Sequence, residues 1–489
     1  MKRAALLCMA AIATSCSGPS GQPSFGPSAA GSHRSASSSP IQHIVIIMQE
    51  NRSFDNFFYK FPGANYATSG KGHDGRVYQL QALPLKWGHD INHYHWQFLE
   101  DYDRGSNDGW EHQITQPYKS GKGCTDKNWF NEPHCWNFLT GSGNMQMPYS
   151  YTIQAQIKPY WDMAQQYVLG DKTFSSNNGP TFVSHQYLIA GQSGHASEVP
   201  STMPWGCNAP NETENYIEFG EADPPAFGPK VGHEYVGVDP CFPLKQSGTY
   251  PTIADSLDNA GISWRYYVQP REIKGKIQDS YWLNAFAAVR AVFNGPDWTN
   301  GDISMPDTNV LSDIQNGNLA QVSWVMPHGG ASDHPGGGSG NLGPDWVASI
   351  VDAVGKSPYW KNTAIIIMWD EWGGWYDHVL PPQYPDSQTG VYEGLGYRVP
   401  LIVVSPYAKP HYISHKQHEI ASTLRFIEET FKLPFLGAGS GQTYADQRAD
   451  GFDDCFDYTQ QPIKFKNIKP VKEPGSFFLK HTFPEEIDY

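Results

Sequence analysis

The chain has 489 residues, with 34 Lys and Arg against 49 Asp and Glu, and a formal net charge of −15. This acid excess argues against a general basic face of the kind that binds nucleic acids. With 48 Gly, 38 Pro, 16 Trp, 27 Tyr and 24 Phe, the composition also excludes a disordered chain, and the length allows two to four domains or one large α/β domain.

The N-terminus has the pattern of an export signal. Lys2 and Arg3 precede a small and apolar run at residues 4–13, which is much shorter than the roughly 20 residues of a membrane span. Residues 13–16 resemble the lipobox of bacterial lipoproteins, so Cys16 would carry a lipid and associate with a membrane; ordinary cleavage nearby is the alternative. Residues 17–39 are rich in Ser, Gly and Pro, which predicts a flexible linker. We therefore predict a signal peptide at residues 1–16 and a periplasmic or extracellular protein.

Five cysteines follow the predicted signal peptide and Cys16. In an oxidising compartment they are better explained as disulfides than as metal ligands. The pairs that are local in sequence are Cys124–Cys135 and Cys207–Cys241, which would leave Cys455 free. The sequence does not settle this pairing.

Four aliphatic runs predict buried strands. They lie at residues 41–48, 322–326, 364–369 and 399–404. Near-continuous apolar runs bounded by turn residues are typical of strands buried on both faces of a largely parallel sheet. Predicted helices between them lie at residues 251–260, 345–356 and 417–431. Alternating strands and helices indicate an α/β fold.

Two of these strands end in acids. Glu50 follows the first run, and Asp370 and Glu371 follow the run at residues 364–369. Ligands of such sheets bind at the carboxyl ends of the strands, so we expect these acids to meet in one crevice. Glu50 alone could be a helix N-cap, but two adjacent acids repel each other unless a cation neutralises them. Taken together with the other motifs of the chain, the pattern favours a metal site.

The middle of the chain supplies a candidate nucleophile. Residues 177–181 contain a Gly-Pro turn that leads into a helical pattern at residues 182–190, so a helix should start near Thr181. The hydroxyl would then lie in the positive field of the helix N-terminus, where phosphate binds readily. The alternative is a simple N-cap, because a threonine hydroxyl needs a metal or a base to become nucleophilic.

Histidines accompany glycine-rich segments near the predicted strand ends. His93, His334 and His378 are the candidates that could bind phosphate oxygens or protonate a leaving group. Each could instead be an ordinary surface or core histidine.

Several motifs together resemble one family. Residues 43–55 resemble the opening signature of the bacterial phosphoesterase family, which comprises non-specific phospholipases C and related acid phosphatases. Further matches lie, in the family order, at residues 90–93 with 108–110, 179–181, 332–335, 370–379 and 396–407. They extend over about residues 41–435, most of the chain after the predicted signal peptide and linker.

The resemblance implies an alkaline-phosphatase-like α/β core with a largely parallel central sheet flanked by helices. It also implies one divalent metal ion, held by Glu50, Asn51, Thr181, Asp370 and Glu371. This all-oxygen set favours Ca²⁺, Mg²⁺ or Mn²⁺.

The same resemblance assigns the catalytic residues. Thr181 would attack phosphorus and form a phospho-threonine that water then hydrolyses. His93, His334 and His378 would surround the phosphate as charge partners or leaving-group acid, and Asp377 would orient one of them. The catalytic domain is expected at residues 40–440, with a C-terminal extension at residues 441–489 packed on or near it.

The chain departs from the family pattern in two places. Residues 183–185 read Val-Ser-His where the family usually has Pro-Asn-Arg; the lost Arg would remove a phosphate or structural contact, so we expect substrate choice to differ. Too few residues follow Leu436 for the two β-rich domains that many of these phospholipases carry, which favours a compact phosphatase or broad phosphodiesterase.

We therefore predict a secreted, metal-dependent phosphoric-ester hydrolase that acts on phosphomonoesters, phospholipid headgroup esters or both. A strict phospholipase C is one alternative. A non-catalytic protein that binds the cell envelope is another, and a sulfatase-like enzyme fits less well. The oligomeric state is left open.

Overall fold

The computed structural model describes most of the chain after the predicted signal peptide and linker. The described residues are 39–86, 89–113, 115–117, 147–211, 213–220, 233–243, 249–273, 276–278, 283–335, 341–383, 394–438 and 444–484. Cys16, Cys124 and Cys135 lie outside these ranges, as do the predicted signal peptide and almost all of the predicted linker.

One large sheet organises the described residues. Its eight strands have the order β15-β12-β16-β1-β17-β18-β8-β19. In that order their bounds are Ile303–Ser304, Trp264–Tyr267, Val322–Val325, His43–Gln49, Thr363–Trp369, Leu401–Val404, Val168–Gly170 and Tyr412–Ser414. The four aliphatic runs thus form the adjacent strands β16, β1, β17 and β18.

The sheet is largely parallel, as predicted. β1 is central and pairs in parallel with both β16 and β17. The strand β18 is an exception, because it runs antiparallel to both β17 and β8. An apolar run buried on both faces has the same composition in either direction, so the sequence at residues 399–404 could not reveal this reversal.

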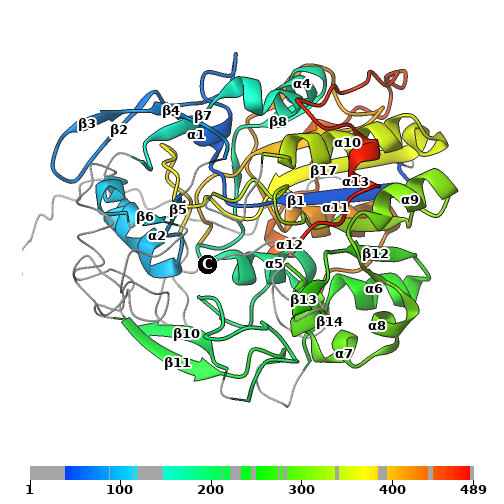
Figure 1. Cartoon of the computed structure of the whole chain (residues 1–489), viewed down its shortest axis with the longest axis horizontal. Coiled ribbons are helices and arrows are strands. Elements are labelled where there is room, and N and C mark those ends of the chain that lie inside the picture. The colour runs from blue at the N-terminus through cyan, green and yellow to red at the C-terminus, as the bar shows by residue number, and fades with distance from the viewer. Residues whose placement is uncertain are drawn as a thin grey trace, which may run out of the picture. The chain divides into compact units, whose positions relative to one another are not determined.

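Helices flank the sheet, which confirms the predicted α/β class (Figure 1). α4, α9, α10 and α13 form one group, in which α10 contacts the other three. In a second group, α5 contacts α6 and α11, and α11 contacts α12. Among the described residues, the helices of at least eight residues are α2 (His95–Tyr102), α4 (Lys158–Gln166), α5 (Thr181–Ala190), α6 (Ile253–Ala260), α9 (Asn309–Asn316), α10 (Gly343–Gly355) and α11 (Ser422–Phe431). Shorter ones are α1 (Phe54–Phe57), α7 (Arg290–Phe293), α8 (Pro296–Asn300), α12 (Ala445–Arg448) and α13 (Gly475–Phe478).

The predicted helices are present with shifted bounds. α6 and α10 lie within two residues of the predicted starts, because Pro251 and Pro344 fit near helix N-termini. α11 starts five residues later than predicted, since residues 418–419 form the short strand β20 (His418–Glu419), which pairs with β9 (Thr173–Phe174).

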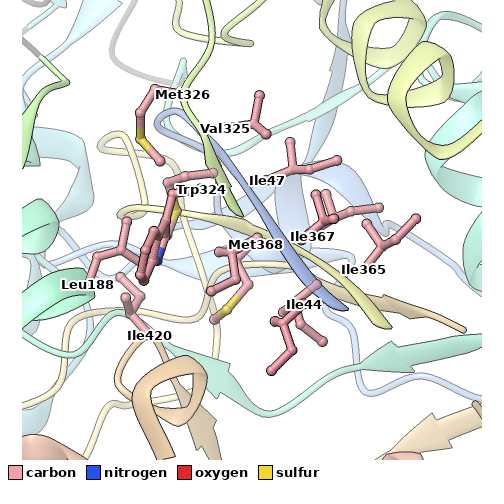
Figure 2. Packing of buried hydrophobic residues seen from close by; sticks show 14 of the residues in the cluster. Ile44, Ile47, Leu188, Trp324, Val325, Met326, Ile365, Ile367, Met368 and Ile420 are labelled. Atoms are coloured by element: carbon pink, nitrogen blue, oxygen red, sulfur yellow. The ribbon is translucent and has the colours of Figure 1, made fainter. Parts of the chain in front are cut away.

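The core lies on both faces of the central strands (Figure 2). Side chains of a strand alternate between faces, so Ile365 and Ile367 of β17 lie opposite Met368. Met368 lies on the side of Leu188 from α5, and all of these residues are fully buried. The core therefore anchors α5 against the strands whose ends carry the acids.

Small strand pairs lie outside the large sheet. They are β2 (Ser69–Lys71) with β3 (Val77–Gln79), β4 (Gln81–Leu83) with β7 (Ser150–Thr152), β5 (His89–Ile91) with β6 (Thr115–Pro117), β10 (Asn215–Gly220) with β11 (His233–Val238), and β13 (Arg271–Ile273) with β14 (Lys276–Gln278). A disulfide joins Cys207 and Cys241, one of the two expected pairs, and Cys455 is a free, buried thiol.

The C-terminal residues pack on α10. The buried carboxylate of Asp345 accepts hydrogen bonds from the backbone amides of Val471, Lys472 and Glu473, at 2.5–2.9 Å. α13 follows and contacts α10 as well. Among the described helices, none has the length and apolarity that a membrane crossing requires.

Candidate active site

The ends of β1 and β17 bring Glu50 and Asp370 together. The two strands pair in register from His43 opposite Thr363 to Gln49 opposite Trp369. The next residue of each strand is an acid, so the carboxylates emerge at the same edge of the sheet. The backbone amide of Asn51 donates to Asp370 Oδ1 at 3.0 Å, which ties the two chain segments to each other. The expected meeting of these strand ends is therefore confirmed.

Two residues with a left-handed backbone conformation let the turns after β1 and β17 touch at this edge. Asn51 has a φ of 56° and Gly373 a φ of 64°, both in the left-handed region. A Cβ atom on Gly373 would lie 2.2 Å from the carbonyl oxygen of Asn51, so only glycine allows the two turns to touch. The amide of Gly373 donates to Glu371 Oε2 at 2.7 Å. Glu371 is thereby held next to Asp370, and Glu50, Asn51, Asp370 and Glu371 are all fully buried.

Thr181 reaches this edge from the N-terminus of α5. Pro180 precedes the helix with an extended conformation, and Thr181 is its first residue, as the Gly-Pro turn predicts. Thr181 Oγ1 lies 3.5 Å from Glu50 Oε2. The amide dipoles of α5 place a positive field at this point, which favours anionic groups near Thr181.

His185 joins the same group, although we did not predict it as a site residue. It lies one helical turn after Thr181, on the same face of α5. Its Nε2 atom is 3.4 Å from Glu50 Oε1 and 4.0 Å from Asp370 Oδ2. Potential ligand atoms of Glu50, His185 and Asp370 all lie within 4.8 Å of one another. We call Glu50, Thr181, His185 and Asp370 the site cluster. The spacing of four residues from Thr181 was the sequence signal for His185.

His93 contacts the amide of Asn51. His93 Nδ1 lies 2.7 Å from the carbonyl oxygen of Ile91, which can only accept, so Nδ1 carries the proton. His93 Nε2 then accepts from Asn51 Nδ2 at 3.1 Å. This contact orients the amide, and Asn51 Oδ1 is buried without a hydrogen-bond partner among the described residues. That oxygen is thus a candidate metal ligand.

His334 lies beside His93, with ring centroids 5.8 Å apart. The segment that carries it is fixed by Arg52, whose Nε donates to the carbonyl oxygen of Asp333 at 2.8 Å. Burial raises the pKa of Asp333 to about 7, although the hydrogen bond from Tyr160 and the charge of Arg52 oppose the shift. Burial lowers the pKa of Arg52 to about 10, and the guanidinium stays charged at neutral pH.

Asp377 and His378 belong to a second buried group. Arg398 donates to Asp377 from Nε at 2.7 Å and from Nη2 at 3.1 Å, and Nη2 also reaches Asp55 Oδ1 at 3.3 Å. His378 Nδ1 lies 2.6 Å from Asp55 Oδ2. Asp55, Asp377 and Arg398 are fully buried. We call Asp55, Asp377, His378 and Arg398 the arginine cluster.

Both ring nitrogens of His378 are engaged in the arginine cluster. Nε2 lies 3.1 Å from Asn65 Oδ1, and Nδ1 is bound to Asp55. Burial acts to lower the pKa of His378, but the hydrogen bond and charge of Asp55 outweigh it and raise the pKa. Within the described residues, neither Asp377 nor His378 has a hydrogen bond or ion pair to the site cluster. The structure therefore brings together Glu50, Asn51, Thr181, Asp370, Glu371, His93 and His334, and holds Asp377 and His378 apart from them by their contacts.

The donor set at the strand ends fits a divalent cation. Three fully buried carboxylates, Glu50, Asp370 and Glu371, occupy one sheet edge together with the amide oxygen of Asn51. Burying several anions side by side is unfavourable unless a positive charge neutralises them. Carboxylate and amide oxygens suit Ca²⁺, Mg²⁺ and Mn²⁺.

The sequence comparisons point to one family. The family model described as "Phosphoesterase family" matches residues 41–434. Hemolytic phospholipase C of Pseudomonas aeruginosa is 25% identical over 446 residues, which cover 80% of this chain and 53% of that protein. Phospholipase C B of Mycobacterium tuberculosis is 24% identical over 433 residues, covering 81% of this chain and 74% of that protein.

The chain spans about half the length of the Pseudomonas relative. Among solved structures, it is similar to a protein in the alkaline phosphatase superfamily from Vibrio parahaemolyticus, with a TM-score of 0.31 and 12% identity. That similarity covers 57% of this chain and 63% of the other.

Proposed function

Because the chain belongs to the Phosphoesterase family, we propose that it is an exported, metal-dependent hydrolase of phosphoric esters that works through a phosphorylated Thr181. One observation carries the proposal. A hydroxyl at a helix N-terminus lies 3.5 Å from a carboxylate of a buried acidic group that fits a divalent cation. A nucleophile, a charge-stabilising centre and a positive helix end thus converge on one point.

Glu50, Asn51, Thr181, Asp370 and Glu371 would hold the cation. When bound, it would favour the ionised form of the nucleophile and neutralise charge on the phosphate oxygens.

In the first step, Thr181 Oγ1 forms a bond to phosphorus while the bond to the leaving alcohol breaks. The Glu50 carboxylate is the acceptor within reach of the hydroxyl proton. We assign His334 as the group that protonates the leaving oxygen: with Nδ1–H held by the carbonyl oxygen of Pro335, the doubly protonated ring would give up the proton on Nε2 and become neutral. Water then hydrolyses the phospho-threonine.

The other predicted residues receive supporting roles. His93 holds the amide of Asn51 so that its oxygen is available to a cation. We assign Asp377 and His378 to holding the segment after β1 in place through Asp55 and Arg398, instead of the phosphate-binding roles that the resemblance implies. Named relatives that are phospholipases C support phospholipid headgroup esters as substrates, beside phosphomonoesters.

The test is hydrolysis of a chromogenic phosphomonoester and of phosphatidylcholine vesicles by the full chain, with and without chelator. We expect Thr181→Ala to abolish turnover of both substrates. Thr423→Ala is a matched control, since Thr423 is also a buried threonine in the first turn of a helix, α11. Its hydroxyl donates to the nearby backbone carbonyl of Ile420. Turnover that survives both chelation and Thr181→Ala would sink the mechanism.

The relative rates on the two substrates distinguish a phosphatase from a phospholipase. A folded protein that hydrolyses neither, and that purifies without metal, would instead indicate the non-catalytic envelope-binding alternative.

A further inference from the structure

The site cluster contains an imidazole that the predicted all-oxygen ligand set lacks. His185 is buried, with 2% of its side chain exposed, and its Nε2 atom faces two carboxylates at 3.4 and 4.0 Å. Hydrogen bonds between nitrogen and oxygen are normally about 2.7–3.2 Å long. Atoms that share one cation, at bond lengths of about 2.0–2.2 Å, lie roughly 3–4 Å from each other. The distances from His185 Nε2 to the two carboxylates match those between atoms that bind the same cation.

The other ring nitrogen of His185 fixes the tautomer. Nδ1 lies 3.3 Å from the carbonyl oxygen of Leu283, which can only accept a hydrogen bond. Nδ1 therefore carries the hydrogen, and Nε2 presents its lone pair to the carboxylates. Histidines that bind metals in proteins are oriented in this way, with the second nitrogen bonded to a carbonyl or carboxylate.

His378 shows how closely a buried histidine approaches a carboxylate that it bonds directly in the same molecule. As the ion-pair partner of Asp55, it approaches the carboxylate to 2.6 Å. His185 stays at 3.4 Å or more from both of its carboxylates, although all three side chains are buried. We would expect a protonated His185 to approach these carboxylates more closely. A neutral imidazole that shares a cation with them would stay at this distance.

From this geometry we infer that His185 is itself a ligand of the divalent cation, which makes the centre a mixed nitrogen and oxygen site. The inference rests on the proposed function, because that function places the cation at the site cluster. Imidazole shifts the preference of a site away from Ca²⁺ and Mg²⁺ and toward Mn²⁺, Fe²⁺, Co²⁺ and Zn²⁺.

The experiment detects the nitrogen directly. The full chain is stripped with chelator, loaded with Mn²⁺ and measured by electron spin-echo envelope modulation. We expect modulation from one directly bound imidazole nitrogen in the wild type, and its loss in His185→Gln, which keeps a polar side chain of similar reach. His43→Gln is the matched control, because His43 also bonds a backbone carbonyl through Nδ1 but lies at the opposite end of β1.

A second measurement compares metal affinities. In competition titrations, His185→Gln should lower the preference for Mn²⁺ over Ca²⁺ by at least about tenfold. Bound Mn²⁺ without nitrogen modulation in the wild type, or modulation that persists in His185→Gln, would overturn the inference while leaving metal-dependent hydrolysis intact. A protein that binds no Mn²⁺ would overturn the cation site as well. Nitrogen modulation together with full turnover by Thr181→Ala would refute the nucleophile and leave His185 as a ligand.

Discussion

The site cluster and the arginine cluster are built from equivalent parts of the fold and are neutralised differently. Each takes one acid from the segment after β1, Glu50 at its start or Asp55 in α1, and one from the segment after β17, Asp370 or Asp377. In the arginine cluster, Arg398 and His378 contact the acids at 2.6–3.3 Å. In the site cluster, the described separations from His185 are 3.4 and 4.0 Å.

This difference teaches how one sheet edge can serve two purposes. Where the chain supplies its own cations, the buried acids act as a brace. Where it gathers acids, an amide oxygen and an imidazole around a hydroxyl, it fits a cation taken from solution. The following predictions change one member of either cluster, from the largest expected effect to the smallest.

Asp370→Asn should have the largest effect. Loss of a carboxylate that holds the cation should lower kcat for a chromogenic phosphomonoester at least about a thousandfold, because metal stabilisation of transition-state charge contributes several kcal/mol. Stopped assays at saturating Mn²⁺ measure this. The metal-free variant should unfold no earlier than metal-free wild type, since one buried charge has been removed. Near-normal turnover would contradict the role of the site cluster.

Arg398→Met should be the most damaging to stability. It leaves Asp55 and Asp377 buried without their guanidinium, which typically costs about 3–5 kcal/mol. Urea unfolding measures the free energy of unfolding. The triple variant with Asp55→Asn and Asp377→Asn should recover part of the loss, because the stranded charges are gone. A loss below about 1 kcal/mol, which is what surface ion pairs contribute, would mean that the arginine cluster is not a brace.

Metal removal should separate the clusters. Saturation with cation at about a hundredfold over its Kd should stabilise the wild type by about 2.7 kcal/mol, because only the folded chain assembles the ligands. Thermal unfolding with and without chelator tests this. The stabilisation should vanish in Asp370→Asn and persist in His378→Gln. The same response in both variants would erase the distinction between the clusters.

The pH dependence of stability should report on the arginine cluster with the smallest effect. The pKa of His378 is raised by Asp55, so the folded protein holds this proton more tightly than the unfolded chain. Its contribution is complete below the unfolded pKa of about 6.5 and is lost as the pH rises through the higher folded value.

Unfolding at pH 6 and pH 9 measures this contribution. Wild type should lose more stability than His378→Gln over that interval, because only wild type gives up the proton that Asp55 stabilises in the folded state. Equal losses in both proteins would show that His378 does not pair with Asp55 as a cation.

Much of the site was predictable because it depends on strand ends. The aliphatic runs before Glu50 and Asp370 predicted parallel strands, and parallel strands carry their last residues to one edge. The Gly-Pro turn likewise predicted the helix start at Thr181. These features follow from local sequence and from the direction of a parallel sheet.

The remainder depends on packing between distant segments. The direction of β18 could not be predicted, because a buried apolar run has the same composition whether the strand is parallel or antiparallel to its neighbours. Which of several histidines reaches the acids at the strand ends depends on how α5 packs against the sheet, so His185 was missed. The partners of His378 could not be predicted either, because Asp55 and Arg398 are distant in sequence and reach it only through the fold.

The central position of β1 has a consequence for how the protein is made. β1 is synthesised first among the sheet strands, yet its two neighbours, β16 and β17, begin at Val322 and Thr363 (Figure 1). At about 5–20 residues per second, roughly 15–65 s pass before both neighbours exist. Until β16 has been synthesised, the apolar strand has no native pairing on either side. We therefore expect this segment to need shielding while the chain is made, and the acids that follow β1 and β17 can meet only after most of the chain has been translated.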